Sequence, residues 1–128
     1  MVRFSGGENP QREARQQAIL FIQQLQHARQ QAVIEGREYG IRIEGQAYRL
    51  MRWQVRDWEN AAKAHYAGLD LRLEMEGWAR AADDHESQPQ LLIMSSDQAS
   101  SFNLHFEWKG TRLATVSGDG VNEPQLNE

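Results

Sequence analysis

The sequence predicts an α+β fold in which one long N-terminal helix packs on antiparallel β-sheets or a small β-sandwich. Apolar residues recur at helical spacing over the first third of the chain, and alternating strand patterns follow over most of the remainder. Helix and strands are therefore segregated and do not alternate along the chain. This segregation favours an antiparallel sheet packed on the helix.

The predicted helix covers residues 10–35. Asn9 suits a cap for the first free amides, Pro10 suits the first turn, and Gly36 suits the C-terminal stop. At about 1.5 Å per residue the helix would be about 40 Å long. Small, aliphatic and aromatic residues at three- and four-residue spacing form one stripe that a sheet must cover: Ala14, Ala18, Phe21, Ile22, Leu25, Ala28 and Ala32.

After Gly36 the period of the apolar residues changes from helical to alternating. The predicted strands are residues 39–43, 47–55, 69–75, 90–94, 102–108 and 111–116. Turns at 44–46 and 109–110 make two of the strand pairs hairpins. We interpret residues 57–68 and 76–89 as connections, the first with room for a helical turn through Ala61, Ala62 and Ala64.

Length and composition suit a single domain. The 128 residues are 40% hydrophobic and 25% charged, an ordinary globular composition. We expect a flexible lead-in at residues 1–9, whose Gly6-Gly7 pair suggests an engineered boundary, and one globular domain at residues 10–128. Within that domain the helix is followed by a β-rich head over about residues 38–120.

The bulk properties also exclude several classes of partner. A net charge of −4 offers no attractive field for phosphates, so we expect no nucleic-acid partner. The absence of cysteine excludes disulfides and thiol chemistry. No segment contains the roughly 18 to 20 apolar residues that cross a bilayer, so we expect the chain as given to be soluble.

No residue pattern predicts catalysis, a metal site or a cofactor. The four histidines are scattered without an i, i+4 pair, and we interpret them as surface residues: His27, His65, His85 and His105. The run at 83–86 is interpreted as solvated charge, because it lacks the spacing of a calcium loop. Ser95-Ser96-Asp97 and Gly118-Asp119-Gly120 are predicted to be turns, so the sequence indicates a protein that is not an enzyme.

The tryptophans support one alternative. Trp53, Trp58, Trp78 and Trp108 could together line a cleft for a small ligand or carbohydrate. Packing in the core or on a sheet is favoured, because Trp53 and Trp108 lie on predicted strands. A small-ligand-binding sandwich is therefore kept as an alternative.

The outer side of the helix is polar but poor in charge. Glutamine largely replaces lysine and glutamate there, while Leu20 and Ile34 project to this side and Ile19 to its flank. Scattered surface apolar residues are normal in monomers, so this pattern does not require a partner. The candidate partner interface consists of Gln16, Ile19, Leu20, Gln23, Gln24, His27 and Gln31.

Residues 13–43 resemble the end of the long helix and the first strand of GspH-type minor pseudopilins of the bacterial type II secretion system. Ala28-Arg29, Gly36-Arg37 and Tyr39-Gly40 carry much of this likeness, which continues through residues 48–59, 88–108 and 117–120. The chain has Asp97-Gln98 and Ser100-Ser101 where the family often has Gly-Glu and Thr-Pro. The family's N-terminal hydrophobic helix and its peptidase cleavage site are missing, which indicates a truncated soluble piece.

The resemblance implies a pilin-like fold and a structural role without catalysis or cofactors. It implies a subunit near the tip of the secretion fibre that helps to export folded proteins from the periplasm across the outer membrane. The implied partners are the other minor pseudopilins and the major pseudopilin. The implied location is the inner membrane, through the missing helix only, with the head in the periplasm. A minor pilin of a type IV pilus is an alternative.

Overall fold

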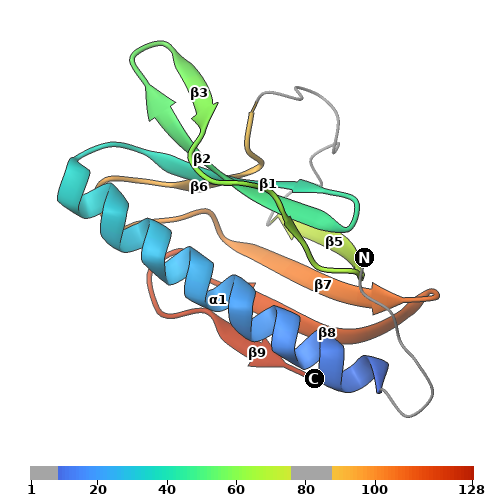
Figure 1. Ribbon diagram of the computed structural model, residues 1–128. Helices are drawn as coiled ribbons and strands as arrows, with labels where there is room; N and C mark the ends of the chain where they lie inside the picture. Colours follow the sequence, from blue (N-terminus) through green and yellow to red (C-terminus); the bar gives the residue numbers. More distant parts are fainter. Residues whose placement is uncertain (1–8, 76–87) are drawn as a thin grey trace.

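The computed structural model describes residues 9–75 and 88–128, and it contains one long helix followed by strands (Figure 1). The helix is α1 (Pro10–Glu35). The strands are β1 (Tyr39–Glu44), β2 (Ala47–Gln54), β3 (Asp57–Asn60), β4 (His65–Tyr66), β5 (Asp70–Met75), β6 (Leu91–Ile93), β7 (Phe102–Trp108), β8 (Thr111–Gly118) and β9 (Gln125–Asn127). This order confirms the predicted α+β fold.

The helix begins and ends where its capping residues predict. The side chain of Asn9 accepts a hydrogen bond from the backbone N–H of Gln11 at 2.9 Å, which satisfies one of the amides left free at the first turn. At the other end Gly36 has φ 66 and its N–H reaches the carbonyl of Ala32. A residue with a Cβ adopts this left-handed conformation only at a cost, so glycine stops the helix here.

The strands form two antiparallel sheets. One has the order β3-β2-β1-β6, with β4 also paired to β2, and the other has the order β5-β7-β8-β9. The β1–β2 turn joins them, because Gln46 accepts a hydrogen bond from the N–H of Ala67 at 2.8 Å and Gly45 accepts one from Leu71 at 3.0 Å. Figure 1 shows α1 running along the length of the molecule beside both sheets.

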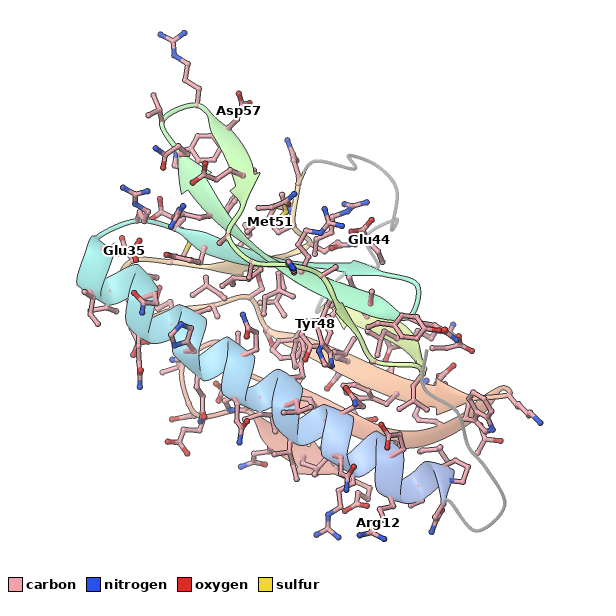
Figure 2. All side chains as sticks on the ribbon, in the orientation of Figure 1. Arg12, Glu35, Glu44, Tyr48, Met51 and Asp57 are labelled. Carbon is pink, nitrogen blue, oxygen red and sulfur yellow. The ribbon has the colours of Figure 1, made fainter. Side chains whose placement is uncertain are left out.

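The apolar stripe of α1 lies in the core as predicted. All of its members are buried except Ile22, which is half-buried. The ring of Phe21 meets the rings of Tyr48, Phe102 and Phe106 edge-on, with centroids 5.1, 6.1 and 6.5 Å apart. Figure 2 shows Tyr48 between the helix and the sheets. Since Tyr48 is on β2 and both phenylalanines are on β7, a single helical side chain joins the two sheets.

A close approach over β1 explains why a glycine follows Tyr39. A Cβ on Gly40 would lie 2.4 Å from the ring carbon Cγ of Pro89, so only glycine lets this part of the chain lie over the strand. Gln90, which follows Pro89, is buried. Its side-chain oxygen accepts a hydrogen bond from the N–H of Ile43 at 2.9 Å, and its side-chain nitrogen donates one to the carbonyl of Ile43 at 3.0 Å. These contacts lead the chain into β6 at the edge of β1.

The prediction that residues 57–68 form a connection with a helical turn is wrong. Residues 57–60 form β3 and residues 65–66 form β4. The three alanines lie in the irregular segment between these two strands. Trp58 pairs across the strands with Trp53, with ring centroids 5.5 Å apart, and Glu59 accepts from Arg52 at 2.7 Å. These cross-strand pairs stabilise a hairpin that a four-residue pattern is too short to predict.

The end of the chain also differs from the prediction. Residues 125–127 form β9 on the edge of β8, so the strand-rich part extends beyond residue 120. The other predicted strands are confirmed, with ends that shift by no more than two residues. The predicted lead-in up to residue 8, and most of the predicted connection at 76–89, lie outside the described residues.

We predict that Phe21→Ala lowers the free energy of unfolding by about 3–5 kcal/mol, because it removes the ring that both sheets pack against. Ile34→Ala is the control: this side chain is 77% exposed, so its loss should change stability by less than about 0.5 kcal/mol. Urea unfolding followed by tryptophan fluorescence measures both values. Equal effects of the two variants would show that Phe21 does not hold the sheets together.

Candidate assembly surface

The candidate interface residues lie along the outer side of α1 and along its flank beside β2 and β4. Five of them are exposed and two, Gln24 and Gln31, are half-buried. Ile19 and Leu20 are each 42% exposed, and Ile34 further along the helix is 77% exposed. Figure 2 shows Arg12 on this outer side of the helix, pointing away from the sheets. The predicted residues therefore share a surface, and part of that surface is aliphatic.

This surface is almost free of charge. From Gln16 to Ile34 the helix contains no aspartate, glutamate or lysine, and its single arginine, Arg29, is only 9% exposed. The exposed part of this stretch consists of amides, aliphatic groups and the imidazole of His27 over about 28 Å. Removing such a surface from water costs much less free energy than removing charged side chains.

A groove runs beside the middle of this surface. Leu20, Gln23 and Gln24 form one side of it, and its volume is about 250 Å³. The other side comes from the sheet layer and from the connection that leads into β4, and consists of Tyr48, Leu50, Ala62, Lys63 and His65. The remaining candidates, Gln16, Ile19, His27 and Gln31, lie along α1 outside the groove.

A series of polar contacts connects His65, in the wall of the groove, to α1. The amide nitrogen of Gln17 donates to the carboxylate of Glu13 at 3.1 Å, so the amide oxygen faces Nε2 of His65 at 2.8 Å. This arrangement places the proton of His65 on Nε2. The imidazole also packs against the ring of Tyr48, with centroids 5.1 Å apart. Gln17 is buried, which the helical pattern did not predict.

The prediction that all histidines are surface residues is wrong for His105. It is 5% exposed in the centre of its sheet, where Nδ1 lies 2.7 Å from the hydroxyl of Thr115 and Nε2 contacts the carboxylate of Glu74. This hydrogen bond holds the pKa of Glu74 below its ordinary value. His27 is exposed as predicted, His65 is half-buried, and His85 lies outside the described residues.

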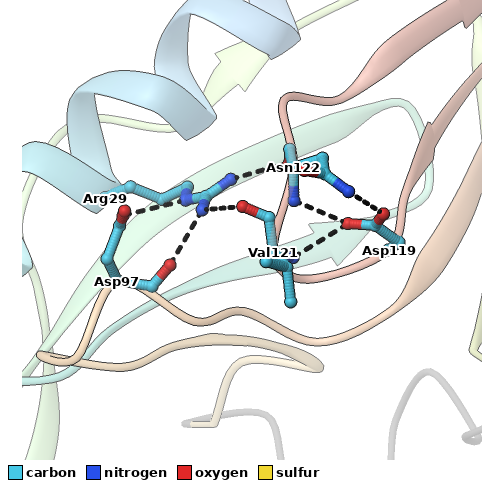
Figure 3. A network of polar contacts seen from close by, with 5 residues as sticks. All are labelled: Arg29, Asp97, Asp119, Val121 and Asn122. Carbon is cyan, nitrogen blue, oxygen red and sulfur yellow. Dashed lines mark hydrogen bonds and ion pairs between the residues drawn. The ribbon is translucent and has the colours of Figure 1, made fainter.

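Arg29 joins the helix to two turns on the other flank of α1 (Figure 3). Its Nε donates to the carboxylate of Asp97 at 3.1 Å, and Nη2 donates to the carbonyls of Asp97 and Val121 at 2.8 and 2.9 Å. Nη1 donates to the carbonyl of Asn122 at 3.1 Å. The planar guanidinium suits this set of acceptors, because its donors point in fixed directions.

Asp119 shapes the turn that faces Arg29. Its carboxylate accepts hydrogen bonds from the backbone N–H groups of Val121 and Asn122 at 2.9 and 2.8 Å, and from the side chain of Asn122 at 2.8 Å. Figure 3 shows the resulting turn with the Asn122 and Val121 carbonyls directed at the guanidinium. These hydrogen bonds lower the pKa of Asp119 from 3.8 to about 2.

The sequence predicted these turns but not their connection to the helix. Ser95-Ser96-Asp97 and Asp119-Gly120 lie in turns or bends as expected, whereas Gly118, predicted to be in the same turn, is the last residue of β8. From the sequence, Arg29 was notable only as part of the Ala28-Arg29 pair that carries the family resemblance. The signal that could have identified it is an isolated arginine on the flank of an apolar stripe, in a helical stretch that otherwise avoids charge.

The tryptophans do not come together in one cleft among the described residues. Trp53 and Trp58 form a pair on the β2–β3 hairpin, near the C-terminal end of α1. Trp108 ends β7 at the β7–β8 turn, and β8 places Leu113 against Gln11 at the N-terminal end of α1. Trp78 and the acidic run at 83–86 lie outside the described residues.

Residues 9–75 and 88–128 contain neither a candidate metal site nor a candidate membrane-spanning helix. These residues contain no group of three or more histidine, aspartate and glutamate side chains placed to hold a metal ion. No helix within them is long and apolar enough to cross a membrane.

Comparison with known families identifies the group of proteins to which the chain is related. The family model described as type II transport protein GspH matches residues 13–121, most of the chain. The chain belongs to the GspH family. The resemblance inferred from the helix and from the strand order is therefore confirmed.

Two relatives bear the name type II secretion system protein H. The one from Pseudomonas aeruginosa is 32% identical over 112 residues, which cover 75% of this chain and 65% of the relative. The one from Aeromonas hydrophila is 30% identical over 118 residues, which cover 77% of this chain and 64% of the relative. The chain thus spans a little under two thirds of the length of these GspH relatives.

Solved structures share the fold. The crystal structure of the minor pseudopilin EpsH from the type II secretion system of Vibrio cholerae superimposes with a TM-score of 0.77 at 23% identity, covering 92% of this chain and 95% of that one. The solution structure of E. coli GspH gives a TM-score of 0.75 at 22% identity, covering 98% and 95%. The predicted pilin-like fold, with a long helix on antiparallel sheets, is confirmed.

We predict that Arg29→Met lowers the free energy of unfolding of this GspH-family chain by about 2–4 kcal/mol, because it leaves the acceptors of two turns without their donor. Arg12→Met is the matched control: Arg12 is exposed, so its loss should cost less than about 0.5 kcal/mol. Urea unfolding measures the difference. If both substitutions cost the same, the guanidinium does not hold the turns.

We also predict a pH-dependent effect of Asp119→Ala. Because folding lowers the pKa of Asp119, its stabilising effect is complete above the unfolded value near 4 and is lost as pH falls towards about 2. The variant should therefore unfold at a lower temperature than the unsubstituted chain at pH 6, and this gap should narrow below about pH 4.

Asp119→Asn serves as the control for this titration, since it keeps an acceptor oxygen but cannot ionise. The stability difference between the alanine and asparagine variants should not change with pH. A gap between Asp119→Ala and the unsubstituted chain that is equal at pH 6 and pH 3 would contradict the prediction. Thermal unfolding followed by circular dichroism is the measurement.

Proposed function

We propose that this chain is a structural minor subunit of the type II secretion pseudopilus that packs against neighbouring pseudopilins through the outer side of α1. The observation that carries the proposal is the charge-poor surface from Gln16 to Ile34, together with membership of the GspH family. The partners are the other minor pseudopilins and the major pseudopilin. No nucleic acid and no catalytic step belongs to this role.

The chemistry of the outer surface suits contact between subunits better than permanent hydration. Leu20 and Ile19 offer aliphatic area, and the glutamines offer both donors and acceptors that can pair with a neighbouring helix. Depletion of charge at the centre is the compositional mark of protein interfaces. A surface made in this way loses little hydration when a neighbour covers it.

In the proposed assembly, α1 continues from a membrane-inserted segment and the strand-rich head lies in the periplasm. The subunit takes a position near the tip of the fibre and helps to build the fibre that exports folded proteins across the outer membrane. The relatives named type II secretion system protein H support secretion over the alternative of a type IV pilus. The separation of Trp108 from the other described tryptophans gives no support to a ligand-binding sandwich.

We predict that Leu20→Glu leaves the domain folded but weakens its binding to a partner pseudopilin by about tenfold or more. The side chain is 42% exposed, so the folded state tolerates a carboxylate, whereas a covered interface does not. The measurement is titration calorimetry against the periplasmic domains of the pseudopilins encoded in the same secretion gene cluster. Circular dichroism of the variant reports folding.

The matched control is Val55→Glu, which introduces the same carboxylate at a residue 82% exposed in the β2–β3 turn, outside the surface from Gln16 to Ile34. It should leave binding unchanged. Unfolding of the Leu20 variant would assign this residue to the core and refute the interface. The interface would also be refuted if the Leu20 variant folds and binds every partner as tightly as the unsubstituted chain.

A further inference from the structure

The lining of the groove beside Leu20 combines aliphatic and aromatic side chains with an exposed lysine at its rim. Leu20 and Leu50 supply aliphatic surface, and Tyr48 contributes an uncharged phenol, whose pKa burial raises from 10 to about 12. Lys63 lies exposed in the connection before β4 and makes no ion pair with the described part of the chain. Among the described residues, no aspartate or glutamate lines the groove.

This local charge is opposite in sign to that of the protein as a whole. The chain carries a net charge of −4, yet the ionisable groups on the rim are Lys63 and His65. The imidazole of His65 contacts Gln17 through Nε2, whereas the exposed ammonium of Lys63 has no ion-pair partner among the described residues and is open to a partner. A complementary surface therefore presents a carboxylate here.

The size and position of the groove indicate what occupies it. A volume of about 250 Å³ lies below the roughly 300 to 1,000 Å³ of small-molecule sites, so a protruding side chain fits better than a cofactor. The groove is also continuous with the proposed contact surface through Leu20, Gln23 and Gln24. Subunits related along a fibre contact each other through two different surfaces, so a groove on one requires a protrusion on the next.

We propose that this groove receives, from a neighbouring pseudopilin, an aliphatic side chain that packs on Leu20 and Leu50 and an adjacent carboxylate that pairs with Lys63. This inference rests on the proposed function, since it specifies the chemistry of the partner at the same surface. At the groove the partner must supply a carboxylate, whereas the rest of the α1 surface can be covered by uncharged side chains.

The two lysines of the chain provide a matched pair of charge reversals. Lys63→Glu changes the groove, while Lys109→Glu changes the β7–β8 turn, where the ammonium lies 5.7 Å from the ring centre of Trp108. Both variants alter the net charge equally. We expect Lys63→Glu to weaken binding to one pseudopilin periplasmic domain by about tenfold at 50 mM salt, and Lys109→Glu to leave it unchanged.

Two further measurements test the two parts of the contact separately. The effect of Lys63→Glu should shrink at about 500 mM salt, because screening weakens a rim ion pair. Ala62→Trp fills the groove without changing charge, and it should weaken the same interaction at both salt concentrations. Replacing the contacting acid of that partner by lysine should restore binding to the Lys63→Glu variant.

The inference fails if Lys63→Glu behaves like Lys109→Glu, or if Ala62→Trp has no effect on any pseudopilin domain. If either result is found while Leu20→Glu still weakens binding, the proposed function stands and only the occupant of the groove is wrong. If Leu20→Glu also has no effect, both fail. A loss of self-association alone, measured by sedimentation, would identify the occupant as a second copy of this chain and refute the inference.

Discussion

The structure depends on the burial of one apolar stripe of α1 against two sheets at once. Phe21 contacts rings from β2 and from β7, and the alanines on either side of it have no exposed surface, so the strands can approach the helix closely. Neither sheet covers this stripe by itself, because its aromatic contacts come from both. The position of α1 therefore sets how the two sheets pack together.

Two buried polar residues fix the rotation of the helix about its axis. At 100° per residue, Gln17 and Arg29 lie on opposite flanks of the apolar stripe. Gln17 contacts His65 on the β4 side, and Arg29 reaches the turns after β6 and β8. Turning the helix would leave both groups buried without partners, at considerable cost. The outer side of α1 is therefore held facing away from the sheets, which is the requirement for a defined contact surface.

Much of this fold could be predicted from the sequence, because helix caps and apolar periods are local signals. Asn9, Gly36 and the alternation in β1, β5 and β7 act within a few residues of one another. The β3 strand and the buried His105 depend instead on partners about five to thirty residues away, such as Trp53 and Glu74. Periodicity likewise predicted the candidate residues on α1, but the groove requires Lys63 and His65 from a segment predicted to be a connection.

The distribution of charge supports the division of the surface into a wetted part and a part suited to contact. Apart from the buried Arg29–Asp97 pair, the ion pairs of the described residues lie on the sheets, as in Arg52–Glu59 and Arg112–Glu107, and at the two ends of the helix, as in Arg15–Glu128 and Arg37–Glu35. Exposed pairs contribute little to stability, so folding alone gives no reason to keep them off the middle of α1. Desolvation does give a reason, because each charge on that surface would oppose its burial by a neighbour. The absence of charge from Gln16 to Ile34, Arg29 apart, is therefore better explained by assembly than by the stability of the isolated domain.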